Sequence, residues 1–492
     1  MGGLSSDTMV RAEATADEKS IATPTVKTST LLRALLLLAA PVMIEQMLHA
    51  FAGLADTYIA NHVVQVGSVT TAGVTTEQTA ANQRHQTAAG AAMGTIAYLL
   101  WFMGLVAGAL GTGSTAIIAR ATGARHRRLA NSICGQSIGL ALAAGIVVAV
   151  GAYVFAGTIA NAMGLGGEAV ELARGFIKII SFGLPFMLVL MVANACLRGA
   201  GDTVSPALAM VVVDVVNIGL SFSLTYGWFG LPAMGFYGIA VGALSGYVAG
   251  GTMQVINLLI GRGGARLFLH RLSPHWHNMR RLLRIGLPNA AESAAMWIVN
   301  IILIRIINDM DPTAASGAAH AIAVRVEAFS YLGGFAIAIA ATTLVGQSLG
   351  MKNPLRAERA AWLAYALGGG LMTLAGMVFV FFSPAFARLM SSDPAVIELV
   401  SWCLFYAGFG QAGFAAAIIF GGSLRGAGDT FSVMLINMTS LVAIRLFGVL
   451  VMTQVYQASL SAIWILLSFE LFVRGVAMFA RFRHGGWKLI KV

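Results

Sequence analysis

The sequence predicts an all-α integral membrane protein with twelve transmembrane helices in two six-helix lobes, and three observations lead to this fold class. First, 58% of the 492 residues are hydrophobic and only 10% are charged, whereas soluble proteins carry about 25% charged residues. Second, residues 86–119, 130–167 and 360–387 contain no Lys, Arg, Asp or Glu. A spanning helix needs about 20 apolar residues, so each stretch is long enough to cross a bilayer. Third, the chain contains an internal repeat, described below.

The apolar stretches divide into two sets of six. In an N-lobe of residues 31–260 we expect helices near residues 31–60, 87–115, 130–157, 170–196, 204–227 and 234–260. In a C-lobe of residues 282–481 we expect helices near residues 282–308, 316–346, 357–382, 395–421, 431–455 and 459–481. Polar residues 1–30 are expected to form a flexible cytoplasmic tail, residues 261–281 a cytoplasmic linker and residues 482–492 a second tail.

Basic residues are unevenly distributed among the loops between these helices. They gather in every second loop, near residues 120–128, 262–284 and 352–359, and in the C-terminal tail. The other loops hold only Arg84 and Arg388, together with several acids. Cytoplasmic loops carry the excess of Lys and Arg, so both termini are expected in the cytoplasm of a cell inner (plasma) membrane.

A seven-residue block occurs twice, as residues 197–203 and 424–430, each reading Leu-Arg-Gly-Ala-Gly-Asp-Thr at an offset of 227 residues. The same offset relates Gly123 to Gly350. Such repetition indicates duplicated halves, and transporters built this way often bind their substrate between the repeats. The block suits a tight turn, and its aspartates, Asp202 and Asp429, are expected to cap the next helix.

Composition and motifs exclude several other classes of protein. The net charge of +11 does not indicate nucleic-acid binding, because the basic residues lie in short loops as topology signals. The three cysteines lack CxxC spacing, so no disulfide framework or zinc site is predicted. No P-loop or HExxH motif occurs. Two G-x-S-x-G matches, at residues 135–139 and 346–350, fall in or beside helical spans, where the strand-to-helix elbow of a serine hydrolase cannot form. We therefore expect no enzyme and no cofactor.

Ionisable residues inside the first predicted helix are candidate functional groups, because a charge within a bilayer is expensive. Glu45, His49 and Asp56 fall on one stripe of this helix, within about 40° of one another. Pro41 lies one turn before Glu45 and can kink the helix. Alternatively, each acid could belong to a buried hydrogen-bonded pair that only fixes helix packing.

The fifth predicted helix carries a matching polar face of Asp214, Asn217 and Ser221. If this face meets Asp56, the first half holds two carboxylates, an amide and a hydroxyl in a dry setting. Their oxygens could coordinate Na⁺ at Asp56, Asp214 and Asn217, or a buried carboxylate could pick up and release a proton. The sequence leaves the coupling ion open between Na⁺ and H⁺.

The second half carries different ionisable residues. Asp56 aligns with Leu303, and Asp214 aligns with Leu441, so the ion chemistry is expected in the first half. His320 and Glu327 lie seven residues apart on one helix face, where they could contact a cationic substrate or carry a second proton. A salt bridge from Arg325 to Glu327 is the alternative. Glu470 and Arg474 are spaced for a structural ion pair, whereas Arg305 and Arg445 have no partner evident in the sequence.

Several short motifs occur in a fixed order along the chain. They are Pro41-Val-Met-Ile-Glu45, Gly53-Leu-Ala-Asp-Thr57, the two repeated blocks, Ala318-Ala-His-Ala-Ile322 and Leu344-Val-Gly-Gln-Ser-Leu-Gly350. Over about residues 31–480, their order and spacing resemble the multidrug and toxic compound extrusion (MATE) family. The resemblance implies a V-shaped, two-lobe exporter that exchanges Na⁺ or H⁺ for small, often cationic, organic compounds.

The resemblance also suggests roles for individual residues. Asp56 matches the family's coupling aspartate in helix 1, and Asn217 matches an asparagine of helix 5. Ser221 stands where some members have a second aspartate, which Asp214 could replace from one turn away. Met296 stands where some members have a helix 7 glutamate, and Glu292 lies one turn earlier, so a C-lobe cation site is weakly supported.

Two other functions stay open at the sequence level. A flippase of lipid-linked or polyanionic substrates belongs to the same superfamily, and the intramembrane arginines Arg305 and Arg445 would suit it. A channel is the second alternative. We favour an exporter that works by alternating access as a monomer, with membrane lipid and small organic molecules as its only partners.

Overall fold

A computed structural model describes residues 27–490 except 63–75, 164, 274 and 312–314. Within these ranges the secondary structure is helical throughout. The N-lobe contains α2 (Thr28–His62), α3 (Thr76–Gly123), α4 (Arg127–Val154), α5 (Ala156–Ala162), α6 (Glu168–Ser181), α7 (Leu184–Ala200), α8 (Val204–Tyr226) and α9 (Phe236–Ile260). The C-lobe contains α10 (Trp276–Asp309), α11 (Ala315–Gly350), α12 (Pro354–Met390), α13 (Pro394–Gly426), α14 (Thr430–Thr439), α15 (Phe447–Gln454) and α16 (Leu460–His484).

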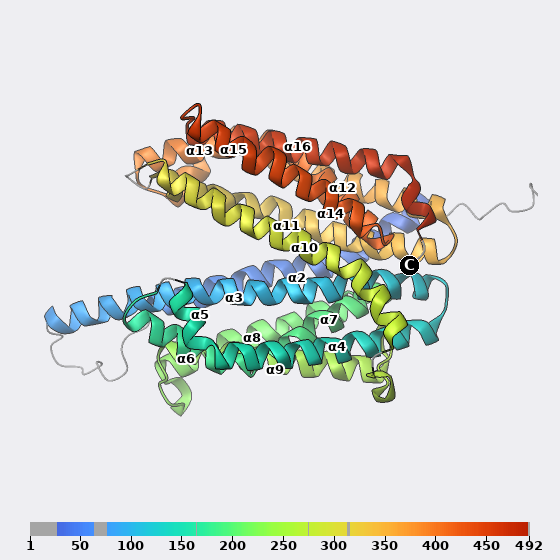
Figure 1. Ribbon diagram of the computed structural model, residues 1–492, viewed down its shortest axis with the longest axis horizontal. Coiled ribbons are helices and arrows are strands. Elements are labelled where there is room, and N and C mark those ends of the chain that lie inside the picture. The colour runs from blue at the N-terminus through green and yellow to red at the C-terminus, as the bar shows by residue number, and fades with distance from the viewer. Residues whose placement is uncertain (1–26, 63–75, 164, 274, 312–314, 491–492) are drawn as a thin grey trace, which may run out of the picture.

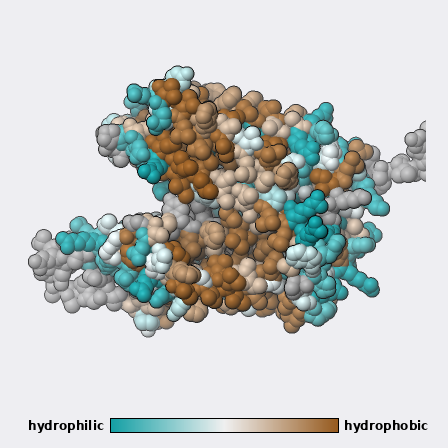
Figure 2. Space-filling view, in the orientation of Figure 1, coloured by the Kyte–Doolittle hydropathy of each residue, from teal (hydrophilic) through white to brown (hydrophobic). Residues whose placement is uncertain are grey.

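The two lobes form a V. Helices α3–α9 make one arm and α11–α16 the other, and the arms converge at the end of the molecule where the C-terminus lies (Figure 1). Near this end α2 and α10 each pack against both arms. Hydrophobic residues cover the middle of both arms, and hydrophilic residues gather at the two ends (Figure 2). Large apolar side chains such as Phe381 and Val147 are 74% and 71% exposed. A broad exposed apolar surface with polar ends fits a bilayer.

The predicted count of twelve spans is confirmed, with one of them broken. Eleven helices among the described residues are long and apolar enough to cross a membrane, and the pair α6 and α7 makes a twelfth, bent by 57°. The break falls at Phe182 and Gly183, just before Pro185 in the first turn of α7. Proline has no N–H to donate to the preceding turn, so it favours a kink at this place.

At the closed end of the V, the two lobes pack through a pair of contacts at equivalent positions of the internal repeat. A Cβ atom on Gly123 would lie 2.0 Å from the backbone oxygen of Gln347, and a Cβ on Gly350 would lie 2.2 Å from that of Arg120. The 227-residue offset relates both pairs. Only glycine allows backbones to approach this closely. The two glycines thus explain why α3 and α11 meet where each ends.

Several predicted boundaries and caps need correction. The linker is shorter than residues 261–281, because α10 already begins at Trp276. Of the predicted C-terminal tail, residues 482–490 pack against the protein: Trp487 is fully buried and donates a 2.8 Å hydrogen bond to the Phe482 carbonyl. Of the predicted N-terminal tail, residues 1–26 lie outside the described residues, as do residues 63–75.

The two repeated blocks behave differently at their aspartates. Asp202 caps α8 as predicted, since its Oδ1 accepts a 2.9 Å hydrogen bond from the backbone N–H of Ser205. The same prediction is wrong for Asp429, whose side chain makes no capping bond and instead pairs with Arg481 at 2.7 Å. A charged partner from α16 competes successfully with the weaker backbone bond.

Candidate functional site

The predicted polar faces of α2 and α8 meet inside the N-lobe. Asn217 Nδ2 on α8 donates a 3.1 Å hydrogen bond to Asp56 Oδ2 on α2, and Ser221 Oγ donates one of 3.1 Å to Asn217 Oδ1. Helix α9 packs closely against α8 beside these hydrogen bonds, because a Cβ on Gly242 would lie 2.2 Å from Ser221 Oγ. Three residues singled out from the sequence are therefore joined in one chain of hydrogen bonds.

Asp214 lies on the same helix but outside this chain. It is 4% exposed, and its Oδ2 has no hydrogen-bond partner among the described residues. Asp56 Oδ1 is also buried, and it has no hydrogen-bond partner among the described residues. The charge of Asp214 interacts electrostatically with those of Asp56 and His49. Buried oxygens that accept no hydrogen bond are rare and need an explanation, and a bound cation or proton supplies one.

No basic side chain in the described part of the chain forms an ion pair with Asp56 or Asp214. This arrangement differs from that of a structural salt bridge, in which a fixed cation holds the carboxylate in one charge state. The two carboxylates, the amide oxygen and the hydroxyl are all oxygen ligands, the type that a hard cation prefers. The cluster can thus accommodate either a Na⁺ ion or a proton.

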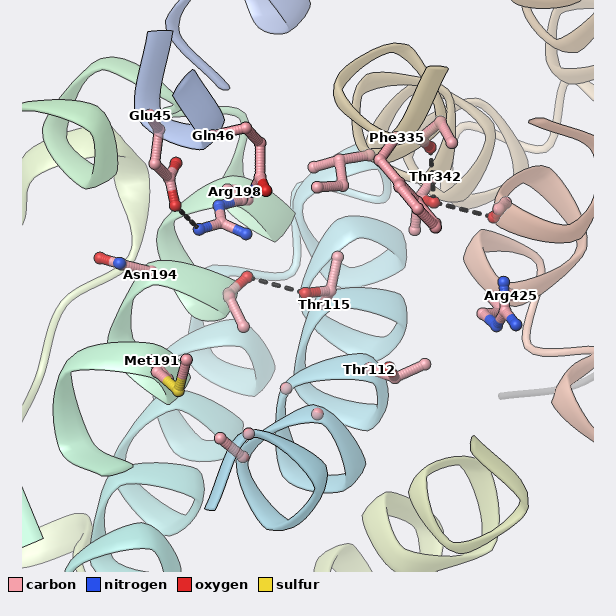
Figure 3. A pocket seen from close by; sticks show the side chains of 18 of the residues that line it. Glu45, Gln46, Thr112, Thr115, Met191, Asn194, Arg198, Phe335, Thr342 and Arg425 are labelled. Atoms are coloured by element: carbon pink, nitrogen blue, oxygen red, sulfur yellow. Dashed lines mark hydrogen bonds and ion pairs between the residues drawn. The ribbon is translucent and has the colours of Figure 1, made fainter. Parts of the chain in front are cut away.

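A separate cavity of about 430 Å³ lies between the lobes, and its lining does not include the four residues of this cluster. Its N-lobe wall comes from α2, α3, α7 and α8 and its C-lobe wall from α11 and α13. Glu45 and Arg198 stand on one side in Figure 3 and Arg425 on the other, with Thr112 and Thr115 of α3 between them in the view. The cavity has the size of a small-molecule site.

The three ionisable residues of α2 have different surroundings, although they share one stripe. Glu45 is buried and accepts a 2.6 Å hydrogen bond from Arg198 Nη2, forming an ion pair. His49 is exposed and lines the cavity. Asp56 is turned to α8, as described above. The single functional stripe predicted from the sequence therefore divides into an ion pair, a cavity residue and a carboxylate of the buried cluster.

Glu292 has a similar partner in the C-lobe. Its Oε1 accepts 2.5 Å hydrogen bonds from Arg425 Nη2 and from Asn437 Nδ2. Arg198 and Arg425, the second residue of each repeated block, were not predicted as functional residues, because the blocks were expected only to form turns. The signal was present, since each arginine recurs at the same place in a motif at the end of a membrane-spanning helix.

His320 and Glu327 lie together in the interior of the C-lobe, outside the cavity lining. Glu327 accepts a 2.9 Å hydrogen bond from Gln411 Nε2, and the His320 ring packs edge-on against Trp464 at 5.6 Å. The alternative of a salt bridge from Arg325 is wrong, because Arg325 is exposed and makes no ion pair with Glu327. The predicted direct contact with a substrate is not supported in this conformation.

A buried ion cluster surrounds Glu470 in the C-lobe. The Glu470 carboxylate is fully buried and accepts hydrogen bonds from Arg445 Nη2 at 2.7 Å, from Arg474 Nε at 2.8 Å and from Ser440 Oγ. The predicted Glu470–Arg474 pair is confirmed. Arg445, for which the sequence showed no partner, lies in a π-helical stretch (Ser440–Leu446) that replaces part of the eleventh predicted helix. Such stretches occur often at functional sites.

Comparisons with known proteins agree with this architecture. The MatE family model matches residues 82–223 and 288–451. The chain is 28% identical over 463 residues to the probable multidrug resistance protein NorM of Thermotoga maritima, covering 92% of each protein. It is 26% identical over 411 residues to the multidrug resistance protein MdtK of Yersinia pestis, covering 83% of this chain and 84% of that protein.

Solved structures share the fold at low sequence identity. A MATE structure in the straight conformation matches with a TM-score of 0.81 and 21% identity, over 95% of this chain and all of that one. The Vibrio cholerae MATE transporter VcmN, in its bent form, matches with a TM-score of 0.80 and 17% identity, over 93% of this chain and 97% of that one. With the family model matched across most of both lobes, the chain belongs to the MatE family, the multidrug and toxic compound extrusion family that its motifs resemble.

Proposed function

We propose that this chain exports small organic compounds by exchanging them for Na⁺ or H⁺ through alternating access. The observation that carries the proposal is the pair of carboxylates Asp56 and Asp214, each of which has a buried oxygen without a hydrogen-bond partner and forms no ion pair among the described residues. The multidrug resistance names of the relatives support an export role. Neither lobe carries a P-loop motif for ATP, so an ion gradient is the energy source that the residues fit.

In this mechanism the ion and the drug favour different arrangements of the lobes. Coupling requires that each ligand bind the two arrangements with unequal affinity. Ion binding at Asp56 would bias one arrangement by changing the charge between α2 and α8, and drug binding in the cavity would bias the other. A membrane potential supplies about 2.3 kcal/mol per charge per 100 mV to drive the cycle.

The orientation follows from the charges at the closed end of the V. The basic residues of the α3–α4 connection and of residues 352–359 lie near the ends of α3 and α11, which meet there. Positive loops indicate the cytoplasmic side. We infer that the closed end faces the cytoplasm in the inner membrane, that the arms open outward and that the monomer is the working unit.

The other functions considered for this sequence have less support. A flippase of polyanionic lipids needs free positive charge in its cavity. Of the two arginines that would suit it, Arg445 pairs with Glu470 at 2.7 Å, and Arg305 is exposed on α10; neither lines the cavity. A serine hydrolase needs an exposed nucleophile on an elbow, yet Ser137 and Ser348 lie within α4 and α11 and are buried.

The exchange itself is testable with purified protein in proteoliposomes. An outward-directed gradient of a fluorescent drug should drive counter-movement of either Na⁺ or H⁺, followed with an ion-selective dye, and an imposed gradient of that ion should drive drug movement. Each ion is tested alone. Ion conductance that persists without drug would favour the channel and overturn the exchanger.

Asp214→Asn is expected to weaken coupling without abolishing it. Asp214 adds a second negative charge beside Asp56 but takes no part in the chain of hydrogen bonds from Asn217. We expect about a fivefold or larger rise in the ion concentration needed for half-maximal drug exchange, measured in the same proteoliposomes. Full coupling in this variant would reduce Asp214 to a packing role.

A further inference from the structure

Two long polar side chains cross from one lobe to the other at the closed end of the V. Arg120 Nη2, near the end of α3, donates a 2.9 Å hydrogen bond to the carbonyl of Ala427, just beyond α13. Gln347 Nε2, near the end of α11, donates one of 3.3 Å to the carbonyl of Gly199 in α7. The offset of 227 residues relates Arg120 to Gln347, and it relates Gly199 to the residue just before Ala427. The duplication therefore placed a similar cross-lobe hydrogen bond on each side of the closed end.

Arg120 also reaches a second place in the C-lobe. Its Nη1 donates a 2.5 Å hydrogen bond to the carbonyl of Ile490, close to the C-terminus, which lies where the arms converge (Figure 1). A planar guanidinium has five N–H donors and can bind two carbonyls at once, whereas the amide of Gln347 has a single nitrogen. The arginine thus joins α3 of the N-lobe to two separate segments of the C-lobe.

Residues 486–490, which we call the C-terminal segment, are anchored to the C-lobe. Trp487 is fully buried, and its ring stacks on that of Phe482 of α16 at a centroid distance of 5.1 Å. Lys488 Nζ forms a 2.7 Å ion pair with Glu358 Oε2 of α12. Because both anchors belong to the C-lobe, the segment moves with that lobe, and its hydrogen bond to α3 connects the two lobes.

The hydrogen bonds of Arg120 suit a contact that forms and breaks repeatedly. Arg120 forms no ion pair among the described residues, and both of its acceptors are neutral carbonyls. A guanidinium binds a carbonyl less strongly than it binds a carboxylate. The ion pairs of Glu45, Glu292 and Glu470 instead each join side chains of a single lobe. The contacts of Arg120 can therefore be released without separating opposite charges.

We propose that Arg120 and the C-terminal segment form a lock, which stabilises the arrangement with the closed end shut and is released when the lobes part there. Alternating access requires the closed end to open in each cycle. Both acceptors of Arg120 lie on the C-lobe, so separation of the lobes breaks both hydrogen bonds. This inference rests on the proposed function, because a lock has a role only if the lobes rearrange. Arg120 does not line the cavity and is a positioning residue, which sets the populations of the two arrangements.

These populations can be measured as the distance between two spin labels at the closed end. One label is placed at His126→Cys, between α3 and α4, and the other at Leu355→Cys, in the first turn of α12; both positions are exposed. The native cysteines are buried and need no replacement. The test variant is Arg120→Gln, and the matched control is Arg127→Gln, which removes an exposed positive charge from the same connection. Pulsed electron–electron double resonance is recorded on the full-length protein in lipid nanodiscs without drug.

In Arg120→Gln we expect the fraction of molecules with the longer label distance to rise at least about fivefold, because charge-assisted hydrogen bonds that hold the closed end are lost. Arg127→Gln should keep the wild-type distribution. Two populations that Arg120→Gln left unchanged would overturn the lock and leave drug–ion exchange intact. A single distance in every variant, even with saturating drug or with Na⁺ or acidic pH, would overturn alternating access and the lock with it.

Trp487→Ala tests the part of the C-terminal segment while keeping the chain at full length. Loss of this buried anchor should also raise the long-distance fraction, and adding Arg120→Gln should then have a smaller effect than in the wild-type background, because both changes weaken the same contact. An equally large effect of Arg120→Gln in both backgrounds would remove the C-terminal segment from the lock. The unfolding temperature of each variant is measured alongside, so that a shift in populations is separated from a loss of folding.

Discussion

Asp56→Asn is expected to abolish ion-driven drug export. The asparagine can keep the hydrogen bond with Asn217, which joins Asp56 to α8 at 3.1 Å, but it cannot change its charge. The ion would then bind both lobe arrangements equally, and a ligand with equal affinity for two states shifts neither. We expect drug resistance in a hypersensitive bacterial host to fall to the level of the empty vector, and gradient-driven uptake in everted vesicles to fall at least about tenfold.

Asp309→Asn provides the matched control for this experiment. Asp309 ends α10, its side chain is 75% exposed, and its contact with Arg305 is long at 4.0 Å. The same chemical change at this exposed position should leave resistance at the wild-type level. Membrane abundance and thermal stability of both variants are measured alongside resistance. Wild-type resistance from a normally expressed Asp56→Asn protein would remove Asp56 from the coupling mechanism.

Glu470→Gln is expected to destabilise the C-lobe strongly. Glu470 is fully buried and forms ion pairs with both Arg445 and Arg474. Removing one partner of a buried ion cluster leaves charge uncompensated, at a cost of about 3–5 kcal/mol. For a protein of this size we expect the unfolding temperature in detergent to fall by roughly 10 °C, as measured by a thermal-shift assay on purified protein.

Glu398→Gln serves as the comparison, because Glu398 is exposed on α13 in the same lobe. A surface substitution of this kind changes stability by about 0.5 kcal/mol or less. If Glu470→Gln melted at the same temperature as Glu398→Gln, the cluster would contribute no net stability. A second, local measurement is hydrogen exchange of α14–α16, which should increase in Glu470→Gln alone, because Arg445 and Ser440 tether the π-helical stretch to α16.

The two lobes therefore divide their buried charges differently. In the N-lobe, Asp56 and Asp214 form no ion pair among the described residues. In the C-lobe, Glu470 is fully neutralised, and Glu327 is held by Gln411. This asymmetry supports an ion site in the first half, as the alignment of Asp56 with Leu303 predicted. His320 and Glu327 are both buried inside the C-lobe, which was not evident from their spacing.

Several features of this protein could be predicted from the sequence because they depend on short segments. The length and apolarity of each stretch decide whether it spans a bilayer, so all twelve spans could be located, although several helices extend beyond their predicted ends. The repeated blocks indicated two related halves. The polar residues of α2 and α8 recur at helical spacing, so the meeting of Asp56 with Asn217 and Ser221 could be expected once both helices were assumed to pack together.

Only the tertiary structure decided which charges neutralise which others. Glu45 is 153 residues from Arg198, and Glu292 is 133 residues from Arg425; the spacing of residues along one helix cannot identify a partner on another. The π-helical stretch that holds Arg445 was likewise evident only from the structure. The sequence alone determined that charges lie within the membrane. Long-range packing determined which of them are paired, since an ion pair forms only where the fold brings both side chains within contact distance.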